Sequence, residues 1–209
     1  MTLSFNQELS DITDFGVGLP DGWHPLPLGA EVPGVWAGEL GERLCPEPDH
    51  REALVAELEL ARVRLASFAS PTLTAAVWVP APESGRPAAA VVFELTDLGE
   101  VDTPDGYERQ LAAYADHQEP GLSYYSVQTW REAVDAGPLV GSYNLVSHFD
   151  PEAGLGALEE RVVIGVFPAN AAQFVQFIFS AENIGTFVNM PQQTQDFVST
   201  LTVTLEVRA

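Results

Sequence analysis

The sequence contains no lysine: its nine basic residues are all arginines, set against 30 acidic residues. Without lysine the chain cannot form a Schiff base with a substrate and lacks the phosphate-binding lysine of a nucleotide loop. Cysteine is nearly absent as well. The single Cys45 excludes an internal disulfide and a cysteine-based metal cluster. We therefore expect no cofactor chemistry that depends on either residue type.

Positive charge is scarce overall, and the formal net charge is −21. An acidic surface repels nucleic-acid phosphates and anionic lipid headgroups, so neither nucleic acid nor a membrane surface is predicted as a partner. A protein partner, including a basic one, remains open. No apolar run approaches the length of a membrane span, and residues 1–15 lack the basic leader of an export signal. These features predict a cytoplasmic protein that is monomeric or weakly homo-oligomeric.

Motifs that carry chemistry are also missing. The four histidines show no metal-ligand spacing, and the sequence has neither the glycine loop of a dinucleotide site nor a GxSxG nucleophile element. We predict no catalytic, cofactor or metal site. One alternative stays open, in which His148 and the nearby Asp150 act at the end of a strand in a small hydrolase or isomerase.

A hairpin at 161–181 is the segment around which the rest of the chain is organised. Both of its strands are apolar on both faces, and the segment 88–95 is nearly all apolar too. Strands of this kind must be covered on both sides, which places them at the centre of a sheet. The prediction is an α/β (α+β) fold, with residues 1–209 forming one sandwich domain whose mainly antiparallel central sheet is flanked by helices.

The other elements follow from periodicity and turn residues. We expect a long loop over 28–45 and a Gly-containing loop over 150–158. A helix is expected from Pro48, capped by Asp49, with an apolar stripe that runs to Phe68 and faces the sheet. Further helices should begin at caps Thr103 and Asn189, and further strands should cover 73–79, 122–131, 139–149 and 201–207.

Aromatic residues on two of these strands are the remaining lead within the sheet. Alternation places Tyr124 and Trp130 on one face, Tyr125 on the other, and Tyr143 on the next strand. An uncovered face would give these rings a role as a binding wall, whereas a face beneath a helix would make them core. Because large apolar side chains are mostly buried, we favour the core.

The order of elements resembles that of the Mog1/PsbP-like family of α/β/α sandwich proteins. The resemblance rests on the opening FGVGLPDGWHPLP and on the ending, in which the hairpin VVIGVFPANAAQFVQFIF precedes a short helix and the strand DFVSTLTVTLEV. It implies a non-catalytic binding or assembly protein. Many bacterial members are lipoproteins or periplasmic proteins. The family has no shared catalytic motif, so the resemblance assigns no site residues.

From these observations we expect a non-catalytic protein-binding or accessory/assembly protein of the bacterial cytosol. The segment from 181 to 196 is rich in amides and poor in charge, as the centres of protein interfaces tend to be. We predict a partner contact there, with Phe187 and Met190 as anchors beside Gln192 and Gln193. A carrier of a small apolar ligand is the third alternative.

Overall fold

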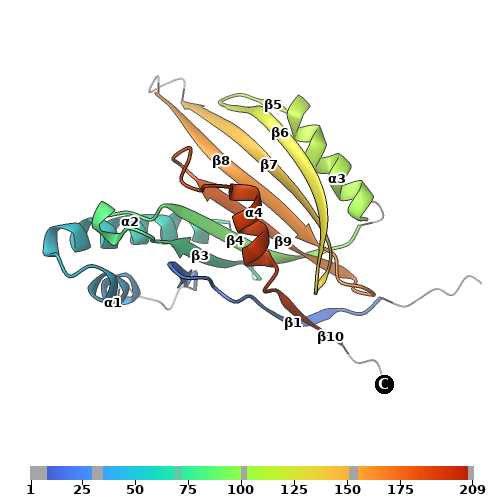
Figure 1. Cartoon of the computed structure of the whole chain (residues 1–209), viewed down its shortest axis with the longest axis horizontal. Coiled ribbons are helices and arrows are strands. Elements are labelled where there is room, and N and C mark those ends of the chain that lie inside the picture. Colours follow the sequence, from blue (N-terminus) through green and yellow to red (C-terminus); the bar gives the residue numbers. More distant parts are fainter. Residues whose placement is uncertain are drawn as a thin grey trace, which may run out of the picture.

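A computed structural model of the chain describes residues 9–29, 35–68, 70, 72–99, 103–150 and 155–206. Its main feature is an eight-stranded sheet with the order β2-β3-β4-β9-β8-β7-β6-β5, in which every pairing is antiparallel (Figure 1). Strands β1 and β10 form a separate two-stranded sheet. The α/β sandwich expected from the sequence is confirmed.

The strands are β1 (Ile12–Gly16), β2 (Trp23–Leu26), β3 (Thr74–Trp78), β4 (Ala89–Asp97), β5 (Gln118–Glu119), β6 (Leu122–Val134), β7 (Gly137–Asp150), β8 (Leu155–Val166), β9 (Gln173–Ala181) and β10 (Thr202–Leu205). The helices are α1 (Val35–Leu44), α2 (Pro48–Ala66), α3 (Pro104–Ala112) and α4 (Met190–Val198), with short 3₁₀ turns η1 (Pro82–Ser84) and η2 (Ala113–Asp116). No helix within the described ranges is long and apolar enough to cross a membrane.

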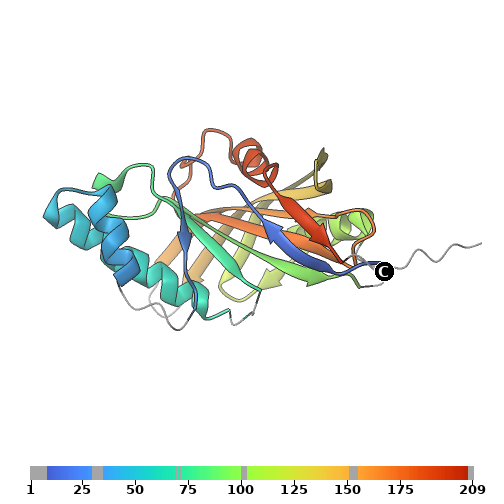
Figure 2. The same ribbon diagram turned by 90° about the horizontal axis from the view of Figure 1, so that it is seen from below.

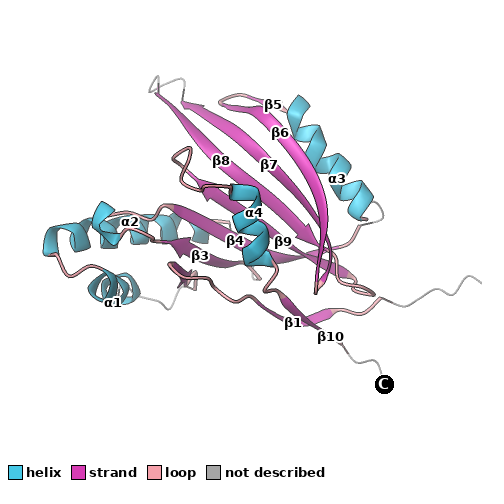
Figure 3. Ribbon diagram, viewed as in Figure 1, coloured by secondary structure: helices cyan, strands magenta, loops and turns pink. Residues whose placement is uncertain are grey.

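The predicted hairpin forms the two central strands, β8 and β9, and β4 lies beside β9 as expected. Phe177 and Phe179 on β9 are completely buried. On the opposite face of the same strands Val163 and Phe174 are buried as well, because helices pack on both sides of the sheet (Figure 3). The prediction that strands with apolar residues on both faces lie at the centre of the sheet is therefore confirmed.

Helix α4 and the β1–β10 ribbon cover one side of the sheet, which we call the front face; Figure 2 shows them on the opposite side of the sheet from α2. Their apolar side chains pack with those of β4, β8 and β9 in the largest core cluster. Trp78 anchors one end of it, with its ring stacked on Trp23 and on Phe187 at centroid distances of 6.2 and 4.8 Å. This face is closed by the chain's own aromatics.

The other side, which we call the back face, is covered by two separate groups of helices. Helices α1 and α2 pack over β2, β3 and β4 around Leu54 and Leu58, and α3 packs over β7, β8 and β9 through Tyr107 and Leu111. Tyr107 lies directly over Gly165, where an added Cβ would come within 2.7 Å of the tyrosine ring. The two groups form distinct core clusters, so the sheet between them is left without a helix.

The prediction of a loop over 28–45 is wrong for its second half, because residues Val35–Leu44 form α1; residues 30–34 lie outside the described ranges. Glycine disfavours helix formation, but Gly41 allows α1 to pack closely against α2. A Cβ at that position would approach Val55 of α2 to 2.7 Å, so the glycine permits close contact between the two helices. Tertiary contact outweighs weak helix propensity.

Helix α2 was predicted correctly, but its two ends differ from the prediction. The residue at the N-cap is Glu47 rather than Asp49, and no side chain caps the helix. At the other end Phe68 does not continue the buried stripe: it follows the helix and is 65% exposed.

Strand β8 begins earlier than expected, at Leu155. The predicted loop at 150–158 is therefore shorter, and residues 151–154 are not described.

A β-bulge corrects the aromatic prediction. The register of β6 against β7 shifts between Tyr124 and Ser126, which leaves Tyr125 unpaired and reverses the alternation beyond it. Tyr124 therefore lies on the back face, where it stacks on Tyr114, whereas Trp130 lies on the front face over Gly141. Trp130 and Tyr143 are partly buried against the front core, as favoured from the sequence.

The predicted caps of α3 and α4 are confirmed, unlike that of α2. The Thr103 hydroxyl accepts a hydrogen bond from the Gly106 N–H at the start of α3, and the Asn189 side chain accepts one from the Gln192 N–H at the start of α4. The terminal strand β10 pairs with β1 at the periphery, as its period-of-two pattern indicated.

Candidate functional site

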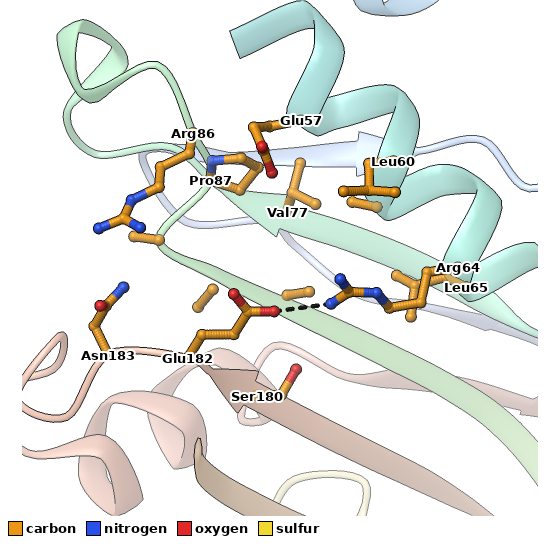
Figure 4. A pocket seen from close by; sticks show the side chains of 14 residues that line it. Glu57, Leu60, Arg64, Leu65, Val77, Arg86, Pro87, Ser180, Glu182 and Asn183 are labelled. Carbon is orange, nitrogen blue, oxygen red and sulfur yellow. Dashed lines mark hydrogen bonds and ion pairs between the residues drawn. The ribbon is translucent and has the colours of Figure 1, made fainter. Parts of the chain in front are cut away.

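The uncovered part of the back face is hollowed into a groove between α2 and the strands β4, β9, β8 and β7. Its main cavity has a volume of about 810 Å³. A second cavity of about 290 Å³, the one drawn in Figure 4, adjoins it. The two share lining residues from α2, β4 and β9, including Arg64, Ala90 and Ser180. We call the combined space the back groove.

The floor of the back groove is formed by side chains that strand register brings together. Ala90, Ser180 and Arg161 lie side by side across β4, β9 and β8, and Val92 pairs with Ile178 in the next row. Each of these three strands pairs with a neighbour on both sides. The backbone N–H and C=O groups of these strands are therefore hydrogen-bonded to the neighbouring strands, and only side chains face the groove.

Apolar residues of α2 and of the segment after it form the wall. Leu65 contributes from the last turn of the helix, and the exposed ring of Phe68 and the side chain of Leu73 extend the wall beyond it. Leu60 lines the smaller cavity and is 51% exposed. Exposed apolar groups around a concave surface are typical of a binding site rather than of ordinary protein surface.

A triad of charged groups occupies the β7–β8 side of the groove. Glu159 Oε1 accepts a hydrogen bond from Arg161 Nε at 2.7 Å, while its Oε2 lies 3.1 Å from the Arg161 guanidinium and 2.8 Å from His148 Nε2. The Glu159 and Arg161 side chains are only 13% and 24% exposed, against 44% for His148. Burial opposes the charge of Arg161, but the Glu159 carboxylate outweighs it and raises the pKa of the arginine. Within this triad, His148 is therefore the side chain most open to a ligand.

A second ion pair bridges the groove at its rim. Arg64 of α2 reaches Glu182, which follows β9, with a nitrogen–oxygen distance of 2.8 Å, as drawn in Figure 4. Both side chains are well exposed, at 61% and 72%. An exposed pair of this kind contributes between about 0 and 1 kcal/mol, so it can open at little cost when a ligand enters.

Two charged side chains of the main cavity have no ion pair or hydrogen bond to any residue that the structure describes. Glu94 lines the main cavity from β4, and Arg86 lies before that strand at the mouth, where Figure 4 shows it beside Asn183. Glu94 is partly buried and Arg86 is exposed. Their charges are available to a ligand.

The sequence predicted one residue of this site, His148. Asp150 is the last residue of β7, and its side chain is not described. The observed partner of His148 is Glu159, which sequence reasoning missed because the two residues meet only through strand pairing. The signal was present: in the β7–β8 hairpin His148 pairs with Ala157, which makes Glu159 its diagonal neighbour.

The predicted partner contact lies on the other side of the sheet. Phe187 and Met190 are buried in the front core, at 7% and 2% exposure, so they do not offer anchors to a partner in this conformation. Gln192 and Gln193 are exposed on the first turn of α4. The contact itself stays a prediction that now depends on these two amides.

No group of three or more His, Cys, Asp or Glu residues in the described part of the chain is arranged to hold a metal ion. Cys45 is buried beneath α1 and α2, away from the groove.

Comparison with known proteins gives similarity of fold. No protein-family model matches the chain, and no curated protein matches it in sequence. Among solved structures it is similar to LpqN of Mycobacterium tuberculosis, described as involved in cell envelope biogenesis, with 12% identity and a TM-score of 0.49 over 91% of this chain and 83% of that one.

Two further structures correspond to the resemblance noted in the sequence. Cyanobacterial PsbP (CyanoP) of Synechocystis sp. PCC 6803 has 9% identity and a TM-score of 0.46, covering 91% of this chain and 86% of its own. The Ran-binding protein Mog1p of Saccharomyces cerevisiae has 10% identity and a TM-score of 0.45, covering 90% and 89%. Proteins of the family that the sequence resembles are thus among the solved structures to which this chain is similar. At these identities the likeness carries no argument about function.

Proposed function

We propose that this chain is a non-catalytic binding or accessory protein and that the back groove is its binding site for a small molecule with an apolar body. The observation that supports this most is the cavity of about 810 Å³, whose floor includes Ala90, Val92 and Ile178. Small-molecule sites typically enclose about 300–1,000 Å³ and combine mostly apolar walls with a few polar groups. The back groove has both properties.

A small molecule fits this groove better than an extended peptide does. Peptides that bind to sheets add a strand at an open edge, where main-chain hydrogen bonds supply the affinity. The groove lies on the face of β4, β9 and β8, which are paired on both sides. An inserted peptide would find no main-chain partner there, and its own N–H and C=O groups would lose their hydrogen bonds to water.

The alternative of a small hydrolase or isomerase is favoured by one observation only, that His148 faces the groove and contacts Glu159. Glu159 is already engaged by Arg161, so the carboxylate serves an internal ion pair as well as the imidazole. We propose that the triad fixes the shape and polarity of the groove wall and does no chemistry.

A protein contact at Gln192 and Gln193 is a second candidate function. It is favoured by the preceding loop, in which Ile184 is 55% and Val188 fully exposed. These two apolar side chains are better placed as anchors than the buried Phe187 and Met190. Cytoplasmic location, a monomeric or weakly oligomeric state and a single domain over 1–209 remain parts of the same proposal.

The groove proposal is tested by filling the floor. Ala90→Trp places a large side chain into the groove, whereas Ala133→Trp places the same side chain on an exposed position of β6. Titration with the uncharged fluorescent probe phenylnaphthylamine should show saturable binding to the parent and to Ala133→Trp. Ala90→Trp should bind about tenfold more weakly or worse, equivalent to a loss of at least about 1.4 kcal/mol. Equal binding by all three proteins, or none by the parent, would overturn the proposal.

A further inference from the structure

Glu94 is the one acidic side chain of the main cavity that has no partner in the described chain. It lies on β4 opposite Gln176, and Gln176 itself donates a hydrogen bond from Nε2 to the Tyr107 hydroxyl. Glu94 is partly buried in the groove. A carboxylate partly withdrawn from water without a counter-ion is unfavourable, so a positive group would stabilise this position.

The other charges of the main cavity are paired or lie at the mouth. Glu159 is held by Arg161 and His148, and Glu182 by Arg64. Arg86 lies before the start of β4, and the strand separates it from Glu94: Ala90 and Glu94 alone are about 13 Å apart at the usual rise of an antiparallel strand. The floor near Glu94 therefore has an uncompensated negative charge.

The net charge of the whole molecule also favours a cationic ligand. With a formal net charge of −21, its long-range field attracts cations and repels anions on approach. Between Glu94 and the rim pair the floor is apolar, formed by Val92 and Ile178 with Leu65 on the wall. A matching ligand has a cationic end and an apolar body.

We propose that the back groove takes an amphipathic organic cation, whose amine pairs with Glu94 while its apolar body lies along Val92 and Ile178. This inference rests on the proposed function of the groove as a small-molecule site and adds the charge and orientation of the ligand. It makes Glu94 a specificity-determining residue. A charge-assisted hydrogen bond of this type corresponds to a preference of about tenfold to a hundredfold for the cation over an uncharged analogue.

The test uses three probes of equal chain length: decylammonium, decanol and decanoate. Calorimetric titration is carried out below the micelle-forming concentrations of the probes and at about 0.15 M salt. At this salt concentration, interactions between exposed charges more than about 8 Å apart are largely screened. The parent should bind decylammonium at least about tenfold more tightly than decanol, and decanoate most weakly. Glu94→Gln should bind decylammonium and decanol almost equally and leave decanol binding unchanged. Glu132→Gln, which removes an exposed acid on β6 outside the groove, should keep the parent's preference.

Each contrary outcome overturns a different statement. If decanol binds but decanoate binds as well as decylammonium, the groove is a binding site and the cation inference is wrong. If Glu94→Gln keeps the preference for decylammonium, the cation is held elsewhere and Glu94 is not its partner. If none of the three probes binds to the folded parent, the groove proposal and this inference both fail.

Discussion

At the scale of single residues, the back-face side chains differ in how far their charges are already satisfied. Glu159 uses both carboxylate oxygens on Arg161 and His148, whereas Glu94 has no hydrogen bond or ion pair to any other residue in the described ranges. In the first arrangement, removing one member would leave the other charge without compensation. The second leaves a charge for a ligand. Two acids that line the same cavity therefore have different roles.

His24 provides a pH-dependent test of the back core. It pairs with Val77 across β2 and β3, and its Nε2 is buried without a partner in the described chain. Burial, and then the charge of Arg43, lower its pKa from 6.5. The unfolded chain thus takes up the proton at a higher pH than the folded one, so this contribution to stability is present above pH 6.5 and lost as the pH falls below it.

We expect the parent to lose more thermal stability than His24→Gln when the pH is lowered from about 7.5 to about 5.5, a window that includes the unperturbed pKa of histidine. The carboxylates titrate in both proteins, so the difference between the two melting profiles isolates His24. Parallel profiles across this range would contradict a lowered pKa.

The residues of the groove could be predicted only in part from the sequence. His148 was identified because it ends an apolar strand next to acids, but Glu159, Arg161 and Glu94 show no local pattern. They meet through the pairing of β4, β9, β8 and β7, which fixes which side chains become neighbours. A register is a tertiary property, and one bulge at Tyr125 was enough to move Tyr124 to the other face.

At the scale of elements, close packing onto glycines determines where side chains and helices lie against the sheet. An added Cβ at Gly141 of β7 would lie 2.3 Å from Trp130 Cζ2, whereas one at Gly156 of β8 would make only ordinary contacts at 3.7 Å and beyond. The two positions are matched strand glycines with different surroundings. Of these two glycines, only Gly141 packs closely against an aromatic ring, that of Trp130.

Gly141→Ala should lower the free energy of unfolding by about 1–3 kcal/mol, because Trp130 must move out of a packed front core. Gly156→Ala should change it by no more than about 0.5 kcal/mol in the destabilising direction, since the substitution also removes backbone freedom from the unfolded chain. Urea denaturation of both variants measures the difference. Similar values for the two would show that Trp130 does not depend on the glycine.

Elements with strong periodicity were predicted well, and those shaped by tertiary contact were not. The hairpin, β4, α2 and the capped helices α3 and α4 follow their local patterns. Helix α1 was missed because its glycines suggest a loop, although Gly41 is what lets it approach Val55. The exposed Phe68 was assigned to a buried stripe because periodicity alone does not show that α2 ends at Ala66.

At the scale of the whole molecule, the two faces of the sheet are covered unequally. The front face is closed by α4 and the β1–β10 ribbon, while α2 and α3 leave the middle of the back face open (Figures 1 and 2). This unequal cover places an apolar-floored cavity in a molecule of strongly negative net charge. The central claim is that this opening is where the protein binds its ligand.

Amide chemical-shift mapping of the isotopically labelled protein during titration with decylammonium tests that claim most directly. The account predicts saturable shifts concentrated on the groove segments of β4 and β9, from Ala90 to Glu94 and from Ile178 to Glu182, with little change in the loop at Ile184 and Val188. Shifts concentrated on that loop, or spread evenly over the surface without saturation, would contradict it.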